Sequence, residues 1–217
     1  MLNKIKTVLA VSLLCAGLAA GQVKTMKKTV IENDAHKKTL RGIPGSFVLR
    51  EEEQKLRDYL RDHPEKQPLS KTIKTAAWNF SLGDTKTWWA TDLSEYEEYE
   101  VPSTCRGITE HAYIFVSDSL WVDGGNGRVN QEAVNVIKEA FDQATPADNS
   151  RGIYDINVAT FGSPPDVDSD PRIIILILDI LDDYPPDSGS YVAGYFYSLN
   201  QYPDGTFSGR RSNEAEI

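Results

Sequence analysis

The residues best suited to chemistry are three aspartates at alternating positions, Asp166, Asp168 and Asp170, just before a strongly apolar stretch. Carboxylates at relative positions 1, 3 and 5 are the first ligands of calcium-binding loops. The EF-hand pattern is not completed, because Pro171 and Ile177 stand where that loop has its Gly and its final Glu. Calcium bound by these carboxylates, together with backbone carbonyls or further aspartates, is one hypothesis. A solvated acidic turn is the other.

Histidine and nucleophile patterns give no complete catalytic site. The three histidines, His36, His63 and His111, form no His-Glu-x-x-His pattern and no pair at helical metal-ligand spacing, so no complete zinc site is present. His111 begins a predicted strand, which indicates a structural role. Cys105 has no evident histidine partner, and no Gly-x-Ser-x-Gly elbow surrounds Ser190, so neither residue predicts a nucleophile.

The sequence patterns around these residues predict a mixed sheet with a backing helix, which would hold the residues in place. Ile173–Leu178 is an unbroken aliphatic run, mostly β-branched, which predicts an inner strand buried on both faces. Further strands are expected at 111–116 and 191–198. A helix is expected at 131–144, with Asn130 as its cap and its apolar face over the sheet. The predicted fold class is therefore α+β, with some α/β character.

An aromatic-rich stretch at 77–110 predicts short antiparallel strands, interrupted near Gly83 and Pro102. Four of its aromatic residues fall close together: Trp78, Phe80, Trp88 and Trp89. Packing against a neighbouring sheet is one interpretation of this cluster, and a carbohydrate-binding platform is the other.

Residues 1–21 have the composition of a signal peptide. Lys4 and Lys6 precede an apolar region at 8–18 and small residues at 19–21. This predicts a secreted protein, extracellular or periplasmic. Nothing beyond this region is long enough and apolar enough to predict a membrane span. After cleavage Cys105 would be the one remaining cysteine, which excludes an intrachain disulfide.

Charge is distributed unevenly along the chain. The formal net charge of −9 would become −11 after loss of the signal peptide, and no basic face remains that would favour nucleic acid. Residues 22–76 carry a net charge of +5 and residues 77–217 a net charge of −16. The basic part, with one short helix expected at 50–62, is either a propeptide docked by complementary charge or a solvated linker. A monomer is expected.

Six phrases occur in an order shared with a known family: 111–116, 152–155, 164–168, 172–180, 190–196 and 212–216. With them the chain from Thr109 to Ile217 resembles the secreted bacterial zinc metallopeptidases similar to hyicolysin. In that family such strands precede a helix with His-Glu-x-x-His, whose histidines bind zinc and whose glutamate activates water. The resemblance implies that residues 111–217 are the upstream half of a zincin-like catalytic domain. It also implies that the zinc ligands and catalytic residues lie beyond Ile217.

The resemblance further implies that residues 191–198 border the substrate cleft. An extended protein or peptide substrate could pair with this strand, with Gly194, Tyr195 and Phe196 as the substrate-binding residues. The expected division of the chain is 1–21 signal peptide, 22–76 leader, 77–110 aromatic strands and 111–217 incomplete catalytic domain.

The leading prediction is therefore the front part of an exported zinc-dependent endopeptidase, made as a zymogen, whose zinc site is absent from these 217 residues. An alternative from another class is a non-catalytic secreted binding or adhesion module, stabilised by calcium, with the aromatic cluster as its contact surface. A third is a propeptide-like region that only inhibits a peptidase.

Overall fold

The architecture is given by a computed structural model, which describes residues 41–66, 78–185, 189–207 and 209–217. The expected signal peptide and the first part of the leader, up to residue 40, lie outside the described residues. Within the described ranges, no helix combines the length and the apolar character needed to cross a membrane.

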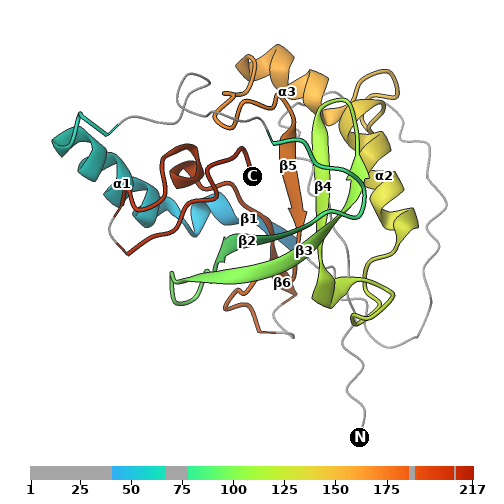
Figure 1. The fold of residues 1–217 in the computed structure, drawn as a ribbon, viewed down its shortest axis with the longest axis horizontal. Helices are drawn as coiled ribbons and strands as arrows, with labels where there is room; N and C mark the ends of the chain where they lie inside the picture. Colours follow the sequence, from blue (N-terminus) through green and yellow to red (C-terminus); the bar gives the residue numbers. More distant parts are fainter. Residues whose placement is uncertain (1–40, 67–77, 186–188, 208) are drawn as a thin grey trace, which may run out of the picture.

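A four-stranded mixed sheet forms the centre of the structure, with strand order β2-β3-β4-β5 (Figure 1). Its strands are β2 (Thr85–Thr91), β3 (Glu98–Ile108), β4 (Ala112–Ser117) and β5 (Ile173–Ile177). The pairs β2/β3 and β3/β4 are antiparallel, whereas β4 and β5 are parallel. The chain crosses from β4 to β5 through α2 (Gln131–Asp142) and α3 (Ile153–Phe161).

A second, two-stranded parallel sheet joins β1 (Arg41–Pro44) to β6 (Ser190–Gly194). Helix α1 (Arg50–Asp62) follows β1, and short 3-10 turns lie at Gly45–Phe47, Asp118–Leu120 and Ser198–Gln201. Segments far apart in the sequence therefore lie side by side, since β1 comes from the leader and β6 from the last third of the chain. The predicted α+β fold class is confirmed.

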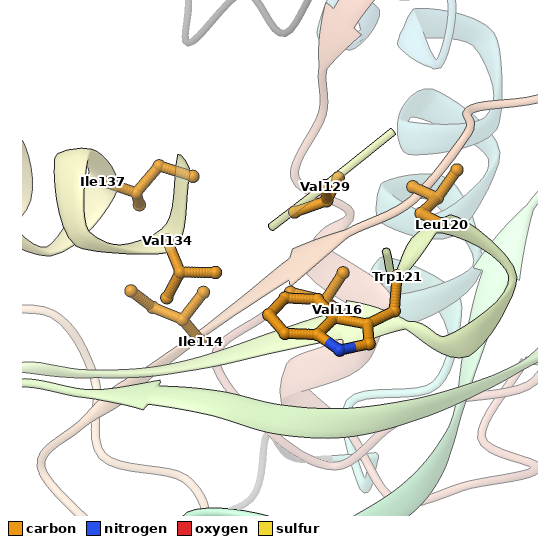
Figure 2. Close-up of a cluster of buried hydrophobic side chains, with 7 residues drawn as sticks. All are labelled: Ile114, Val116, Leu120, Trp121, Val129, Val134 and Ile137. Carbon is orange, nitrogen blue, oxygen red and sulfur yellow. The ribbon is translucent and has the colours of Figure 1, made fainter. Parts of the chain in front are cut away.

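The core is organised on the two faces of β4, in which all six residues are buried. On one face Ile114 and Val116 lie beside Val134 and Ile137 of α2, which confirms that the apolar face of this helix covers the sheet (Figure 2). Asn130 caps α2 as predicted, because its side chain accepts a hydrogen bond from the N–H of Ala133 at 3.0 Å. The helix ends at Asp142, slightly earlier than expected.

The other face of β4 packs against the aromatic cluster. The Phe115 ring meets Phe80 and Trp88 edge-on, with centroids 4.9 and 5.2 Å apart, and Trp88 is fully buried. Aromatic rings prefer such edge-to-face contacts in cores. The packing interpretation is therefore confirmed for Phe80 and Trp88, and the carbohydrate platform is wrong for Trp88, whose ring is fully buried.

The prediction of an inner strand at Ile173–Leu178 is wrong. Strand β5 is the last strand of the sheet among the described residues, and within it only Ile174 is buried. The aliphatic run correctly predicted a strand with apolar surroundings. It could not show that β4 would pair with one edge of β5 while the other edge borders a cleft.

Other predictions differ in detail. Strand β3 runs without interruption through Pro102, which pairs with Thr87, so the predicted break there is wrong. Strand β6 ends at Gly194 and does not reach Ser198. Residues 153–161, for which no element was predicted, form α3. Residues 214–217 form no strand.

Two valines of α2 give a matched test of this core. Val134 is fully buried and Val136 is 61% exposed on the same helix. We expect Val134→Ala to lower the free energy of unfolding by about 2 kcal/mol, because it removes two buried methyl groups and leaves a cavity. We expect Val136→Ala to change it by less than about 0.5 kcal/mol. Urea unfolding measures both, and equal effects would contradict the packing described here.

Candidate functional site

An apolar cleft of about 560 Å³ lies between β5 and β6. Its walls include Ile175 and Ile177 of β5, Ile137 and Phe141 of α2, and the backbone and side chains of β6. Ile217 also lines it, and the N–H of Ile174 donates to the carbonyl oxygen of Glu216 at 2.7 Å. The last residues of the chain therefore lie against β5 where the cleft begins.

One ion pair lines this mainly apolar cleft, together with the polar residues Asp182 and Asn200. Arg128, whose side chain is mostly buried, donates to the exposed carboxylate of Asp179 just after β5. The pair connects the loop before α2 to the acidic segment that follows β5. The cleft is thus an aliphatic groove with polar groups at its edge, a combination typical of sites that bind organic ligands or peptide side chains.

Two of the three predicted substrate-binding residues line the cleft. Gly194 and Tyr195 belong to its lining, whereas Phe196, which is 44% exposed, does not. A Cβ atom added at Gly194 would meet no heavy atom within 4 Å, so there is open space beside this residue. The Tyr195 hydroxyl accepts a hydrogen bond from the N–H of Thr91 at 2.8 Å, and burial raises the pKa of this phenol. The assignment of these residues to substrate binding stays a prediction.

The aspartate motif is part of the interior of the protein. Asp168 is fully buried and Asp170 is 6% exposed, so the solvated-turn hypothesis is wrong for both. Asp168 accepts a hydrogen bond from the N–H of Asp170 at 2.9 Å. Asp170 accepts from the Tyr113 hydroxyl at 2.7 Å and from the N–H of Arg172 at 3.0 Å. Burial and the bond to Asp170 raise the pKa of Tyr113.

Metal ligands are not brought together in the described part of the chain. No group of three His, Cys, Asp or Glu side chains there is placed to hold a metal ion, and the arrangement of Asp166, Asp168 and Asp170 is included in that statement. Both carboxylate oxygens of Asp170 already accept hydrogen bonds from protein groups. Calcium binding at this motif stays a prediction, and the described residues do not fit a zinc site.

The two described histidines make structural contacts. The His111 ring stacks on Tyr154, with centroids 3.8 Å apart, and its Nδ1 lies 3.4 Å from an Asp142 oxygen. The His63 ring stacks on Tyr59 with centroids 4.1 Å apart. His36 lies outside the described residues. These contacts agree with the structural role that the sequence indicated for His111.

Glu216 is a buried acid that the sequence reasoning missed. It is 5% exposed, and its Oε1 accepts a hydrogen bond from the N–H of Val167 at 2.6 Å. Burial, followed by the negative charges of Asp168 and Asp166, raises its pKa to about 7. Its Oε2 has no hydrogen-bond partner among the described residues. The one signal in the sequence was its place in the last phrase of the family resemblance.

A second buried acid–base cluster was also missed. Arg210 forms ion pairs with Glu52 of α1 and, at 3.3 Å, with Glu98 of β3, and all three side chains are largely buried. Burial raises the pKa of Glu98 although Arg210 opposes this. For Glu52 burial acts in the same direction, but hydrogen bonds and charges from Lys55 and Arg210 outweigh it and lower the pKa. The cluster links the leader to the rest of the fold.

Comparison with known proteins gives one distant link. No family model matches the chain. The neutral metalloprotease ShpI of Staphylococcus hyicus is 25% identical over 156 residues, which are 70% of this chain and 31% of that protein. The chain therefore spans about a third of the length of this relative. The similarity connects the chain, at a distance, with bacterial metalloproteases.

The raised pKa of Glu216 predicts a pH-dependent stability. The folded protein retains this proton up to about pH 7, whereas an ordinary glutamate loses it near 4.5. The contribution of Glu216 to stability is therefore largest at low pH and is lost as the pH rises towards 7, by at most about 1.4 kcal/mol per pH unit. Glutamine resembles the protonated acid and can still accept from Val167.

We therefore expect Glu216→Gln to unfold in urea with a weaker dependence on pH than the wild type between about pH 5 and pH 7. The two proteins should be closest in stability at the acid end of this range, and the variant should be more stable near neutrality. Glu214→Gln, two residues earlier in the chain, is the control. Parallel pH profiles for wild type and Glu216→Gln would show that the buried acid ionises normally.

Proposed function

We propose that this chain is the front part of an exported zinc-dependent endopeptidase whose zinc-binding residues lie in polypeptide that follows Ile217. The observation that carries the proposal is the similarity to the metalloprotease ShpI across 70% of the chain. Proteins or peptides are the substrates that such a relative implies. Export, with removal of residues 1–21, is part of the same proposal.

The exposed aliphatic surface supports this proposal. Strand β5 leaves most of its side chains only partly covered, and the cleft beside it is lined mainly by apolar groups. Soluble proteins seldom leave a continuous apolar surface of this kind without a binding partner or a further layer of structure. Ile217 itself lines this cleft, and the carbonyl of Glu216 is bonded to β5.

No group of three His, Cys, Asp or Glu side chains among the described residues is placed to hold a metal ion, and the proposal assigns them no step of the hydrolysis. Their part in the proposed enzyme is to bind and orient an extended peptide on β6. Backbone N–H and C=O groups of such a strand supply affinity, and neighbouring pockets supply specificity. The open space beside Gly194 and the adjoining apolar cleft fit this role.

The alternative of a binding module had the aromatic cluster as its contact surface. That surface is not available at Trp88, which is fully buried against Phe115 of β4. The structure gives this alternative no specific support.

Metal analysis of two purified proteins tests the proposal. We expect the 217-residue chain to retain no stoichiometric zinc and to leave casein intact. We expect the longer polypeptide to retain about one zinc per chain and to cleave casein until a chelator is added. A longer polypeptide without zinc and without hydrolysis would refute the proposed function.

A single substitution tests the role of β6 in the longer protein. Gly194→Val places its new side chain in open space, so we expect an unchanged Tm. If a peptide substrate lies beside this residue, KM should rise by about tenfold, which corresponds to about 1.4 kcal/mol of lost binding. Leu82→Ala, at an exposed position in the turn before β2, is the control. Unchanged KM and kcat in Gly194→Val would remove β6 from the substrate site.

A further inference from the structure

The loop between the 3-10 turn at Asp118–Leu120 and α2 presents an asparagine and a following glycine to solvent. Asn126 is the one asparagine of the 217-residue sequence that a glycine follows, and residues 122–127 are all exposed. A Cβ atom added at Gly127 would meet no heavy atom within 4 Å, and the φ angle of this glycine is +72°. The backbone nitrogen of Gly127 is therefore shielded neither by a side chain of its own nor by neighbouring residues above that position.

The loop is held in place just before this pair and only weakly at the glycine. The N–H of Asn126 donates to the carbonyl of Ser119 at 2.9 Å. Gly125 lies so close to the preceding turn that a Cβ atom there would be 2.5 Å from the carbonyl oxygen of Trp121. The N–H of Gly127 donates to the same carbonyl at 3.3 Å, which is longer than an ordinary N–H···O hydrogen bond. Little energy is therefore needed to free the nitrogen of Gly127.

The side-chain amide of Asn126 is polarised by the backbone of the same loop. Its Oδ1 accepts a hydrogen bond from the N–H of Arg128 at 3.1 Å. A donor at this oxygen stabilises the negative charge that develops when a nucleophile adds to the amide carbon, as in an oxyanion hole. The nucleophile within reach is the backbone nitrogen of Gly127, which closes a ring with the Cγ atom of Asn126. The loop thus combines an activated amide with an unshielded nitrogen.

We propose that Asn126 is a site of spontaneous deamidation, in which the backbone nitrogen of Gly127 displaces the side-chain amide nitrogen. The nitrogen of Gly127 loses its proton and bonds to Cγ of Asn126, the bond from Cγ to Nδ2 breaks, and Nδ2 leaves with that proton as ammonia. Water then adds to either carbonyl of the cyclic succinimide and opens it to aspartate or isoaspartate. The sequence of steps consumes water, releases ammonia and involves no oxidation or reduction. It does not depend on the proposed function.

The product changes the edge of the apolar cleft. Arg128, two residues after Asn126, pairs with Asp179 there, and a carboxylate at position 126 gives this arginine a second acidic partner. Isoaspartate also adds a methylene group to the main chain shortly before Val129, which is 1% exposed and bonded through its N–H to the carbonyl of Leu120. Deamidation therefore alters both the charge and the backbone of a loop that is attached to the core.

Peptide mapping of the folded 217-residue chain, after incubation at mildly alkaline pH, tests the proposal. Trypsin cleavage after Arg106 and Arg128 releases peptide 107–128, in which Asn126 is the only side-chain amide. We expect this peptide to become heavier by about 1 Da, with one added negative charge. Electron-transfer fragmentation should resolve the product into aspartate and isoaspartate forms. We expect conversion about tenfold faster than at Asn149, an exposed asparagine that a serine follows.

Three comparisons decide the outcome. A sample digested without incubation gives the baseline, and Asn126→Gln, which would have to close a larger ring, should leave the mass of peptide 107–128 unchanged over the same time. If the chain unfolded in urea converts at Asn126 and the folded chain does not, the loop protects this residue and the proposal is overturned. Equal rates at Asn126 and Asn149 would overturn it too. A product that contains aspartate without isoaspartate would exclude the succinimide, and with it the role of Gly127.

Discussion

The burial of β4 on both faces is the constraint on which the rest of the structure depends. Side chains of a strand alternate between its faces, so Ile114 and Val116 point to one layer while Tyr113 and Phe115 point to the other. A strand with no exposed residue therefore requires two separate apolar layers. Helix α2 supplies the first layer and the aromatic cluster supplies the second. The two edges of β4 pair with β3 and β5, which gives β4 its inner position in the sheet.

The candidate site is built outward from this strand. Parallel pairing with β4 aligns β5 and places its other edge, where Ile174 is bonded to Glu216, beside the cleft. The Tyr113 hydroxyl reaches from the aromatic face of β4 to Asp170, and so holds the aspartate turn that leads into β5. Glu216 then connects that turn to β5, because its side chain accepts from Val167 and its carbonyl accepts from Ile174.

Local patterns in the sequence predicted the elements well, because each pattern is decided by neighbours along the chain. The helix at 50–62 and the cap at Asn130 are at the predicted positions. The position of β5 in the sheet was not predictable in this way, since an aliphatic run shows apolar surroundings but not which edges are paired. The break predicted at Pro102 is wrong for a similar reason, because the pairing of β2 with β3 continues through this residue.

The candidate site was harder to predict than the fold. The buried state of Asp168 and Asp170 depends on partners such as Tyr113, which is distant in sequence. The leader shows the same limit. Its net positive charge suggested docking onto an acidic domain, but the contacts that the structure describes are apolar side chains and the acidic Glu52 and Glu53. Net charge reports the long-range field of a segment and not which residues meet.

The coding sequence immediately downstream of codon 217 tests the central claim most directly. The account predicts an open frame that continues into an apolar-periodic helix with His-Glu-x-x-His within a few tens of residues, since the proposed function places the zinc ligands after Ile217. A stop codon at that position would contradict it, because the chain would then be complete without zinc ligands and the peptidase proposal would fail.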